Sequence, residues 1–160
     1  MRIIFIAGPA FSGKSIYIER NFPEAKTVKI STFNKIAYEA IDNEELETLA
    51  KNAWLYCKEA LQNTIRTAGA DDTVILEHQL LKKDDRAFYL DAVREVTDEP
   101  VELIVMDPDE DMIERMLNFE KSFIMLHVYE KGKMELPEAQ EGFARIEIAH
   151  PVFNEDDFKR

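Results

Sequence analysis

The feature that most constrains this chain lies at its beginning, where an apolar run passes directly into a glycine-containing loop. The sequence IIFIAGPAFSGKS covers Ile3–Ser15. Its first residues, IIFIA, are continuously apolar, which is typical of a strand buried on both faces of a sheet. The residues that follow spell Gly8-x-x-x-x-Gly13-Lys14-Ser15. A buried strand, a tight loop and a helix are therefore the expected start of the fold.

Each residue type in this loop has a mechanical role in holding phosphate. The two glycines let the backbone turn tightly, so that successive N–H groups point toward phosphate oxygens. Lys14 is expected to reach the β- and γ-phosphates, and the Ser15 hydroxyl to ligate Mg²⁺. The helix that follows turns the positive end of its dipole toward the same anion. The expected nucleotide-binding residues are Gly8, Pro9, Ala10, Phe11, Ser12, Gly13, Lys14 and Ser15.

Length and charge limit the class of protein. A chain of 160 residues is long enough for one domain with a substantial core, which we place at residues 1–153 with a polar tail at 154–160. Asp and Glu outnumber Lys and Arg by 32 to 20, giving a net charge of −12, so nucleic-acid binding would need a local basic patch. The N-terminus lacks the pattern of a signal peptide, and no run approaches the ~20 apolar residues that cross a bilayer. A cytoplasmic protein without membrane contact is expected.

Strand-like apolar runs alternate with helical patterns along the chain. Strands are expected at residues 3–7, 27–30, 73–76, 101–106 and 145–149. Helices are expected at residues 14–20, 44–67, 84–96 and 109–118. This alternation predicts an α/β fold in which helices cover both faces of a parallel sheet.

A phosphate-binding loop alone does not distinguish a kinase from a GTPase or a motor ATPase. A GTPase would need a guanine-reading Asn-Lys-x-Asp after a later strand, and the sequence contains none. A larger ATPase would need a longer chain. The short chain, the early loop and the short strands favour a small-molecule or nucleotide kinase, in which the loop holds ATP and Mg²⁺.

Four stretches resemble the compact P-loop kinases related to phage polynucleotide kinase. They are IIFIAGPAFSGKS, VILEHQLLKKDDRAFYLDAV, VELIVMDPDEDMIERM and VYEKGKMELPEAQEGFARIEIA. The first is highly specific, and the others follow in the family's order. The resemblance implies a nucleoside-kinase-like fold with a five-stranded parallel sheet in the order 2-3-1-4-5, flanked by helices.

The resemblance also implies roles for individual residues. Glu77 stands where the family carries an aspartate after the third strand, and it would serve Mg²⁺ together with Ser15. Arg115 matches a lid arginine that clamps the transferring group and binds the nucleotide. Arg86 matches an arginine that holds the acceptor or the phosphates. The expected catalytic residues are therefore Lys14, Glu77 and Arg115.

The chain departs from the family where the acceptor would bind. The family places a general-base aspartate after the second strand and an arginine three residues later, but the matching residues here are Phe33 and Ile36. A phenylalanine cannot accept a proton, and the neighbouring Lys35 is the expected substrate-binding residue in this region. The second lid arginine is also missing, with only Lys121 nearby, and a lysine does not reproduce the planar, two-pronged grip of an arginine.

Two functions remain open from the sequence. The first is ATP-dependent transfer of the γ-phosphate to a nucleotide-like small molecule or to a polynucleotide 5′ end, with a toxin-type kinase acting on a sugar nucleotide as a related variant. The second is a catalytically silent nucleotide-binding sensor or partner-binding module, which the missing base and lid arginine favour. The histidine after Glu77, His78, is expected to be exposed rather than to act as a base.

Overall fold

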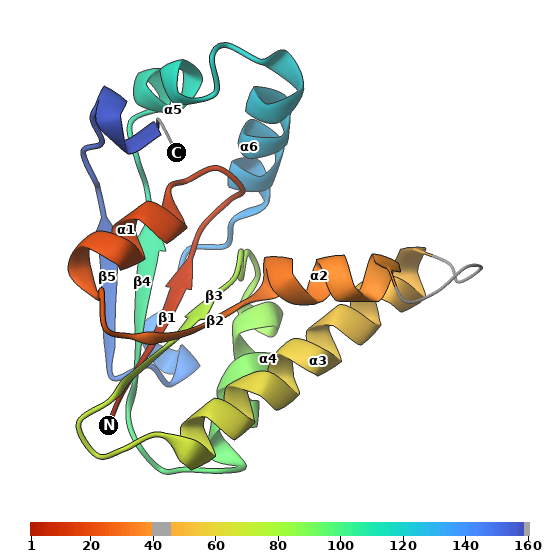
Figure 1. The fold of residues 1–160 in the computed structure, drawn as a ribbon, viewed down its shortest axis with the longest axis vertical. Coiled ribbons are helices and arrows are strands. Elements are labelled where there is room, and N and C mark those ends of the chain that lie inside the picture. Colours follow the sequence, from red (N-terminus) through yellow and green to blue (C-terminus); the bar gives the residue numbers. More distant parts are fainter. Residues whose placement is uncertain (40–45, 159–160) are drawn as a thin grey trace.

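Within residues 1–39 and 46–158, which the computed structural model describes, the strands form one five-stranded parallel sheet (Figure 1). The strands are β1 (Arg2–Ala7), β2 (Lys26–Lys29), β3 (Thr73–Glu77), β4 (Val101–Met106) and β5 (Arg145–Ala149). Their order is β2-β3-β1-β4-β5, which confirms the arrangement that the resemblance implied. The carboxyl ends of parallel strands meet at one edge of the sheet, so the loop after β1 lies beside the ends of β3 and β4.

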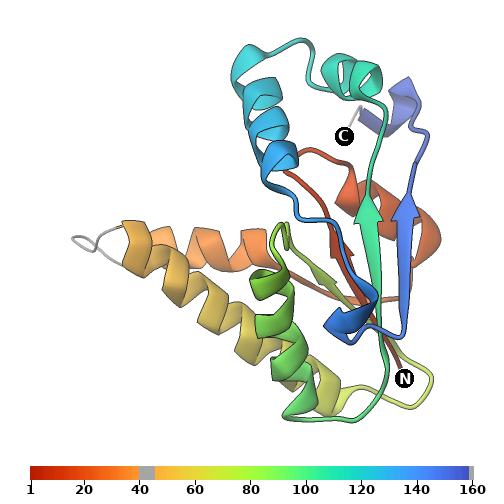
Figure 2. The ribbon, with the colours of Figure 1, turned by 180° about the vertical axis from the view of Figure 1, so that it is seen from behind.

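Helices cover both faces of this sheet. They are α1 (Lys14–Asn21), α2 (Ile30–Glu39), α3 (Leu46–Thr67), α4 (Lys83–Arg94), α5 (Glu110–Met116) and α6 (Lys121–Lys133). Figures 1 and 2 show α1 on one side of the sheet, with α3 and α4 on the other. Two turns of 3-10 helix, η1 (Ala139–Glu141) and η2 (Glu155–Phe158), flank β5.

The alternation of β1 side chains explains why both faces are covered. Ile3 and Phe5 pack with α3 and α4, whereas Ile4 and Ile6 pack with Ile18 of α1 and with α5. All of these β1 side chains are fully buried. Because the central strand is apolar on both faces, neither face can be left in water, and the α/β arrangement follows.

Two helices were not expected from the sequence, α2 and α6. Ile30, expected as the last residue of a strand, is instead the first residue of α2, and it is buried in either assignment. Helix α6 has no apolar stripe, since apolar side chains such as Met125 and Val128 are exposed around it, so its sequence lacks the 3.6-residue period that identifies a helix. The expected helix from residue 44 is confirmed as α3 from Leu46; its first two residues lie outside the described part of the chain.

The described part of the polar tail is held against α1. Phe153, just before it, is buried, and Asp157 forms an ion pair with Arg20. The backbone of Asn154 donates to Asp157 Oδ2 at 2.7 Å and shapes this turn. Among the residues described, no helix combines the length and the apolar character needed to pass through a membrane.

Candidate nucleotide-binding site

The phosphate loop, residues 8–15, connects the end of β1 to the start of α1. Gly13 has a left-handed backbone with φ of 83°, and a Cβ there would lie 2.3 Å from the ring of Phe153. A Cβ on Gly8 would lie 2.7 Å from Ser12 Oγ. Only glycine therefore fits either end of the loop, because each end combines an unusual φ with a close neighbour.

The ammonium group of Lys14 lies inside the loop. It donates to the carbonyl oxygens of Gly8 at 2.7 Å and Pro9 at 2.9 Å. Burial lowers the pKa of Lys14 to about 8, while the carboxylates of Glu77 and Glu130 act in the opposite direction. The group is therefore charged at neutral pH but poorly compensated, so a phosphate oxygen would be a strong partner for it.

The two residues expected to serve Mg²⁺ are adjacent in the structure. Ser15 Oγ donates to Glu77 Oε1 at 2.5 Å, and Lys29 Nζ lies 3.6 Å from the other carboxylate oxygen. The side chain of Glu77 is largely buried at the end of β3. A carboxylate and a hydroxyl are oxygen ligands that suit Mg²⁺, which usually completes its shell with water and substrate phosphate. The donor set at this end of the loop thus fits the metal.

A further polar group is left without a partner in the same loop. Ser12 is fully buried, and within the described residues its hydroxyl forms no hydrogen bond. Buried hydroxyl groups are normally paired. An unpaired hydroxyl beside the loop's N–H groups fits a loop built around an anion.

The loop opens onto a cavity of about 400 Å³. Phe11, Ser12, Gly13, Lys14, Ser15 and Glu77 line it, so the structure brings these expected site residues together. Five further residues that were not expected in the site also line it: Ile16 in α1, Ile30 and Ser31 at the start of α2, Gln79 after β3, and Met116 at the end of α5. The cavity therefore extends from the loop toward α2.

Arg115 lies beside the cavity rather than in its lining. Its side chain is exposed on α5, and its Nε lies 3.4 Å from the backbone oxygen of Asp111 in the same helix. The next residue, Met116, does line the cavity. The side chain of Arg115 must swing from this position before it can reach a phosphate.

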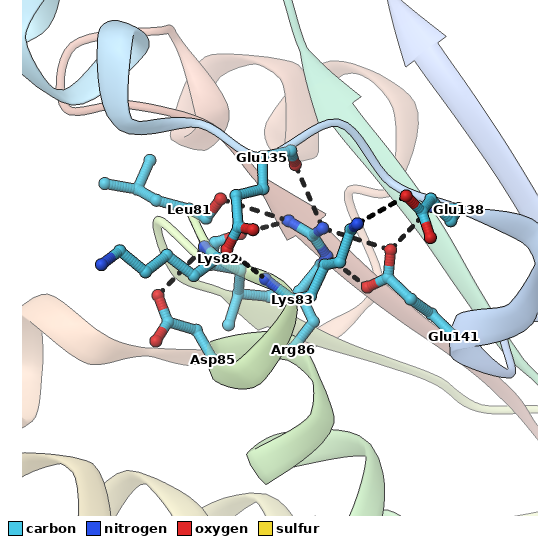
Figure 3. Close-up of polar contacts among 9 residues, drawn as sticks. Leu81, Lys82, Lys83, Asp85, Arg86, Glu135, Glu138 and Glu141 are labelled. Atoms are coloured by element: carbon cyan, nitrogen blue, oxygen red, sulfur yellow. Dashed lines mark hydrogen bonds and ion pairs between the residues drawn. The ribbon is translucent and has the colours of Figure 1, made fainter.

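Arg86, expected to hold the acceptor or the phosphates, is placed outside the cavity lining. Its guanidinium is fully buried and uses all of its N–H groups within the protein (Figure 3). Nε and Nη2 form a two-pronged pair with Glu141 at 2.7 and 3.2 Å. The remaining N–H groups reach the backbone oxygens of Leu80, Leu81 and Glu135. Arg86 thus joins the start of α4 to the segment between α6 and β5.

The residues expected near the acceptor lie along α2. Phe33 is half-buried against the core, and Ile36 is exposed. Lys35 is also exposed and does not contribute to the cavity lining. Ser31, one helical turn before Lys35, lines the cavity together with Ile30.

His78 was expected to be exposed, and this is wrong. The ring is almost completely buried and packs edge-on against Trp54, with ring centroids 4.7 Å apart. Burial lowers the pKa of His78 to about 3, and the charge of Lys14 acts in the same direction. Its Nδ1 accepts from the Leu80 N–H at 3.3 Å, so the ring is neutral and oriented by the backbone.

Helix α6 supplies contacts to the phosphate loop that sequence reasoning missed. His127 Nδ1 lies 2.7 Å from the backbone oxygen of Ala10, and the Ala10 N–H donates to Glu130 Oε1 at 3.0 Å. The ring of Phe123 packs on Phe11 with centroids 5.1 Å apart. These three residues of α6 have the spacing i, i+4, i+7, which places them on one helical face. That spacing was the available signal, but it carries meaning only once the segment is known to be helical.

The sheet order and the loop after its first strand give this chain a fold that it shares with solved P-loop kinases. A protein from Chloroflexus aurantiacus has a similar structure, with a TM-score of 0.65 and 11% identity over 93% of this chain and 84% of the other. Kti12 from Chaetomium thermophilum, solved in complex with ADP-AlF3, has a TM-score of 0.60 and 18% identity over 98% and 93%. A sugar kinase from Janibacter has a TM-score of 0.58 and 18% identity over 92% and 85%.

At these identities the likeness concerns the fold. The chain matches no protein-family model, and the search of curated proteins also finds no match.

Proposed function

We propose that this protein binds ATP and transfers its γ-phosphate to a hydroxyl or phosphate of a nucleotide-like small molecule or of a polynucleotide 5′ end. The observation that carries the proposal is the pairing of Ser15 with Glu77 beside the buried Lys14. A hydroxyl, a carboxylate and an ammonium group at one glycine-flanked loop supply what a magnesium nucleotide needs. The polynucleotide kinase-like assignment remains part of this proposal.

The residues of the site have separate roles in this proposal. The N–H groups of residues 13–15 hold the phosphates, and Lys14 neutralises the β- and γ-phosphates. Ser15 and Glu77 hold Mg²⁺, which would supply charge neutralisation at the transferring group. Arg115, exposed beside the cavity, is assigned the clamp on that group, because an arginine there would stabilise charge in the transition state.

The acceptor is placed between the loop and the start of α2. Ser31 faces the cavity, and Lys35 lies one turn further along the helix with its side chain in solvent, from where it can reach a negatively charged acceptor. Phosphoryl transfer depends mainly on positioning and on charge stabilisation, so the absence of a base at Phe33 does not by itself prevent it. General-base assistance typically raises the reaction rate by about 10²–10⁴-fold, so we expect an enzyme without it to be slow.

A second candidate is a nucleotide-binding module without catalysis, which acts through a partner. The observation in its favour is that, among the described residues, no arginine lines the cavity. Several apolar side chains of α6, including Met125, Val128 and Tyr129, are more than half exposed. Exposed apolar surface of this kind is typical of interaction sites.

Label transfer from γ-labelled ATP with Mg²⁺ separates the two candidates. The acceptors are 5′-hydroxyl DNA and RNA oligonucleotides, nucleosides, nucleoside monophosphates and sugar nucleotides. Lys14→Ala is the inactive variant, and Lys51→Ala, which removes an exposed lysine of α3, is the matched control. We expect transfer to one acceptor class by the protein and by Lys51→Ala but not by Lys14→Ala. Tight ATP binding without transfer to any acceptor would refute the kinase and favour the silent module.

A further inference from the structure

The peptide unit between Pro9 and Ala10 is held from its two ends by opposite charges. Its oxygen accepts a 2.9 Å hydrogen bond from Lys14 Nζ, and its N–H donates a 3.0 Å hydrogen bond to Glu130 Oε1. Only two covalent bonds separate the peptide oxygen from the nitrogen, so the ammonium nitrogen and the carboxylate oxygen are at most about 8.5 Å apart. The negative charge of Glu130 is therefore a fixed part of the phosphate site.

A nucleotide bound to this loop would place its outermost phosphate near the Pro9–Ala10 peptide unit, between Lys14 and Glu130. The lysine of such a loop reaches the β- and γ-phosphates, so the third phosphate of a triphosphate arrives next to Lys14 and close to Glu130. A triphosphate carries more negative charge at this end than a diphosphate. The added charge meets a carboxylate across a short distance, which is unfavourable at any dielectric constant.

Nearby basic groups do not offset this repulsion in the present arrangement. Lys131, one residue after Glu130, pairs with Glu110 at 2.8 Å. Arg115 is exposed, with its Nε toward its own helix. Lys29 pairs with Glu77 on the metal side of the loop. Apart from Mg²⁺ and a repositioned Arg115, both assigned above to the transferring group, Lys14 is thus the principal counter-charge for the third phosphate among the residues that the structure describes.

We infer that Glu130 is a specificity-determining residue of the nucleotide site, whose carboxylate disfavours the third phosphate and shifts the preference of the loop toward nucleoside diphosphates. The contacts of His127 and Phe123 with the loop fix α6 so that this carboxylate stays in place. The inference rests on the proposed binding of nucleotide to the loop. It adds that α6 sets how strongly the triphosphate is favoured over the diphosphate.

The test compares the affinities of ADP and of a non-hydrolysable ATP analogue, both with Mg²⁺, measured by titration calorimetry. Glu130→Gln removes the charge but retains an oxygen that can accept from the Ala10 N–H. For one added phosphate charge about 8 Å from the Glu130 carboxylate, and an effective dielectric constant between 20 and 80, the repulsion corresponds to roughly twofold to thirtyfold in affinity. We expect the affinity for the triphosphate analogue to rise by such a factor relative to that for ADP.

Two control variants separate charge from other effects. Glu130→Asp retains the charge and shortens the side chain, so the ratio of the two affinities should stay within about threefold of the unaltered protein. Glu120→Gln removes an exposed carboxylate just before α6, about 15 Å from Glu130 along the helix, and should leave the ratio unchanged.

If the ratio of the two affinities were unchanged in Glu130→Gln, or if the affinity for the triphosphate analogue alone fell, the inference would be overturned while nucleotide binding stayed intact. If neither nucleotide bound the unaltered protein, or if Lys14→Ala bound both nucleotides as tightly as the unaltered protein does, the proposed function would fail, and the inference with it.

Discussion

Ser15 and Glu77 are separated by 62 positions in the chain, yet the hydroxyl of one donates a 2.5 Å hydrogen bond to the carboxylate of the other. The contact forms because β1 and β3 are neighbours in the sheet, with Ile6 paired to Glu77 in register. It places an oxygen pair suited to Mg²⁺ at the start of α1. The following predictions concern this pair, Lys14, Arg86 and Gly13.

Glu77→Gln should lower the affinity of the site for Mg²⁺, so that nucleotide binding needs a higher Mg²⁺ concentration. Removing one unit of negative charge from a metal-binding or metal-orienting position typically costs about tenfold to hundredfold in metal affinity. Titration of Mg²⁺ at fixed nucleotide concentration measures the change. Glu99→Gln, in the exposed segment before β4, is the matched control. Equal Mg²⁺ dependence in the two variants would contradict a metal role for Glu77.

Nucleotide binding should take up a proton at alkaline pH. Burial lowers the pKa of Lys14 to about 8, so the ammonium group is largely neutral in the free protein at pH 9. Phosphate beside it favours the charged form and raises the pKa again. Calorimetry at pH 9 in buffers with different ionisation enthalpies should show uptake approaching one proton, and almost none at pH 6.5. Identical heats in both buffers at pH 9 would argue against contact between Lys14 and phosphate.

The same pKa shift affects stability, with a defined sign. Between pH 8 and pH 10.5, which is the ordinary pKa of lysine, the unfolded chain holds a proton on Lys14 that the folded chain has lost. The free energy of unfolding attributable to this group therefore rises with pH in that window. Lys14→Met should remove this contribution, which is measured by urea denaturation at pH 8 and pH 10. A contribution that fell with pH would show that the folded pKa is raised instead.

Arg86→Met should destabilise the fold strongly. The change removes the Arg86 contacts to Glu141 and to the backbone oxygens of Leu80, Leu81 and Glu135, and breaking a buried ion pair in this way costs about 3–5 kcal/mol. Urea denaturation gives the change in the free energy of unfolding. Arg94→Met, at the exposed end of the same helix, should cost less than about 1 kcal/mol. Nucleotide affinity of the folded Arg86→Met protein should change little, whereas a selective loss of affinity would return Arg86 to the binding site.

Gly13→Ala should disrupt the phosphate loop. Its Cβ would meet the Phe153 ring at 2.3 Å, and its φ of 83° is unfavourable for alanine. We expect a cost of about 2–4 kcal/mol from strain and overpacking together, with loss of nucleotide binding. Gly132→Ala is the matched control, because a Cβ there meets no atom within 4 Å. It should be neutral or stabilise α6 by up to about 1 kcal/mol. Equal stabilities for the two variants would contradict this account.

The strands and the phosphate loop could be identified from local sequence alone. The bounds expected for β4 and β5, Val101–Met106 and Arg145–Ala149, are those of the structure. Loop residues 8–15 were identified because their role depends on local backbone freedom and on residue type, both of which can be read from neighbouring positions. The strand order followed from the resemblance rather than from any property of the strands themselves.

The contacts of the remaining charged residues depend on packing between elements that are distant in the chain. Arg86 was expected to hold the acceptor or the phosphates, but the segment from Glu135 to Glu141 closes over it and supplies its acceptors. Glu130 was not singled out from the sequence, and the packing of α6 on the loop places it on the Ala10 N–H. In both cases the partner lies far away in the chain. The local sequence pattern does not indicate such contacts, because burial and charge pairing are set by packing between elements.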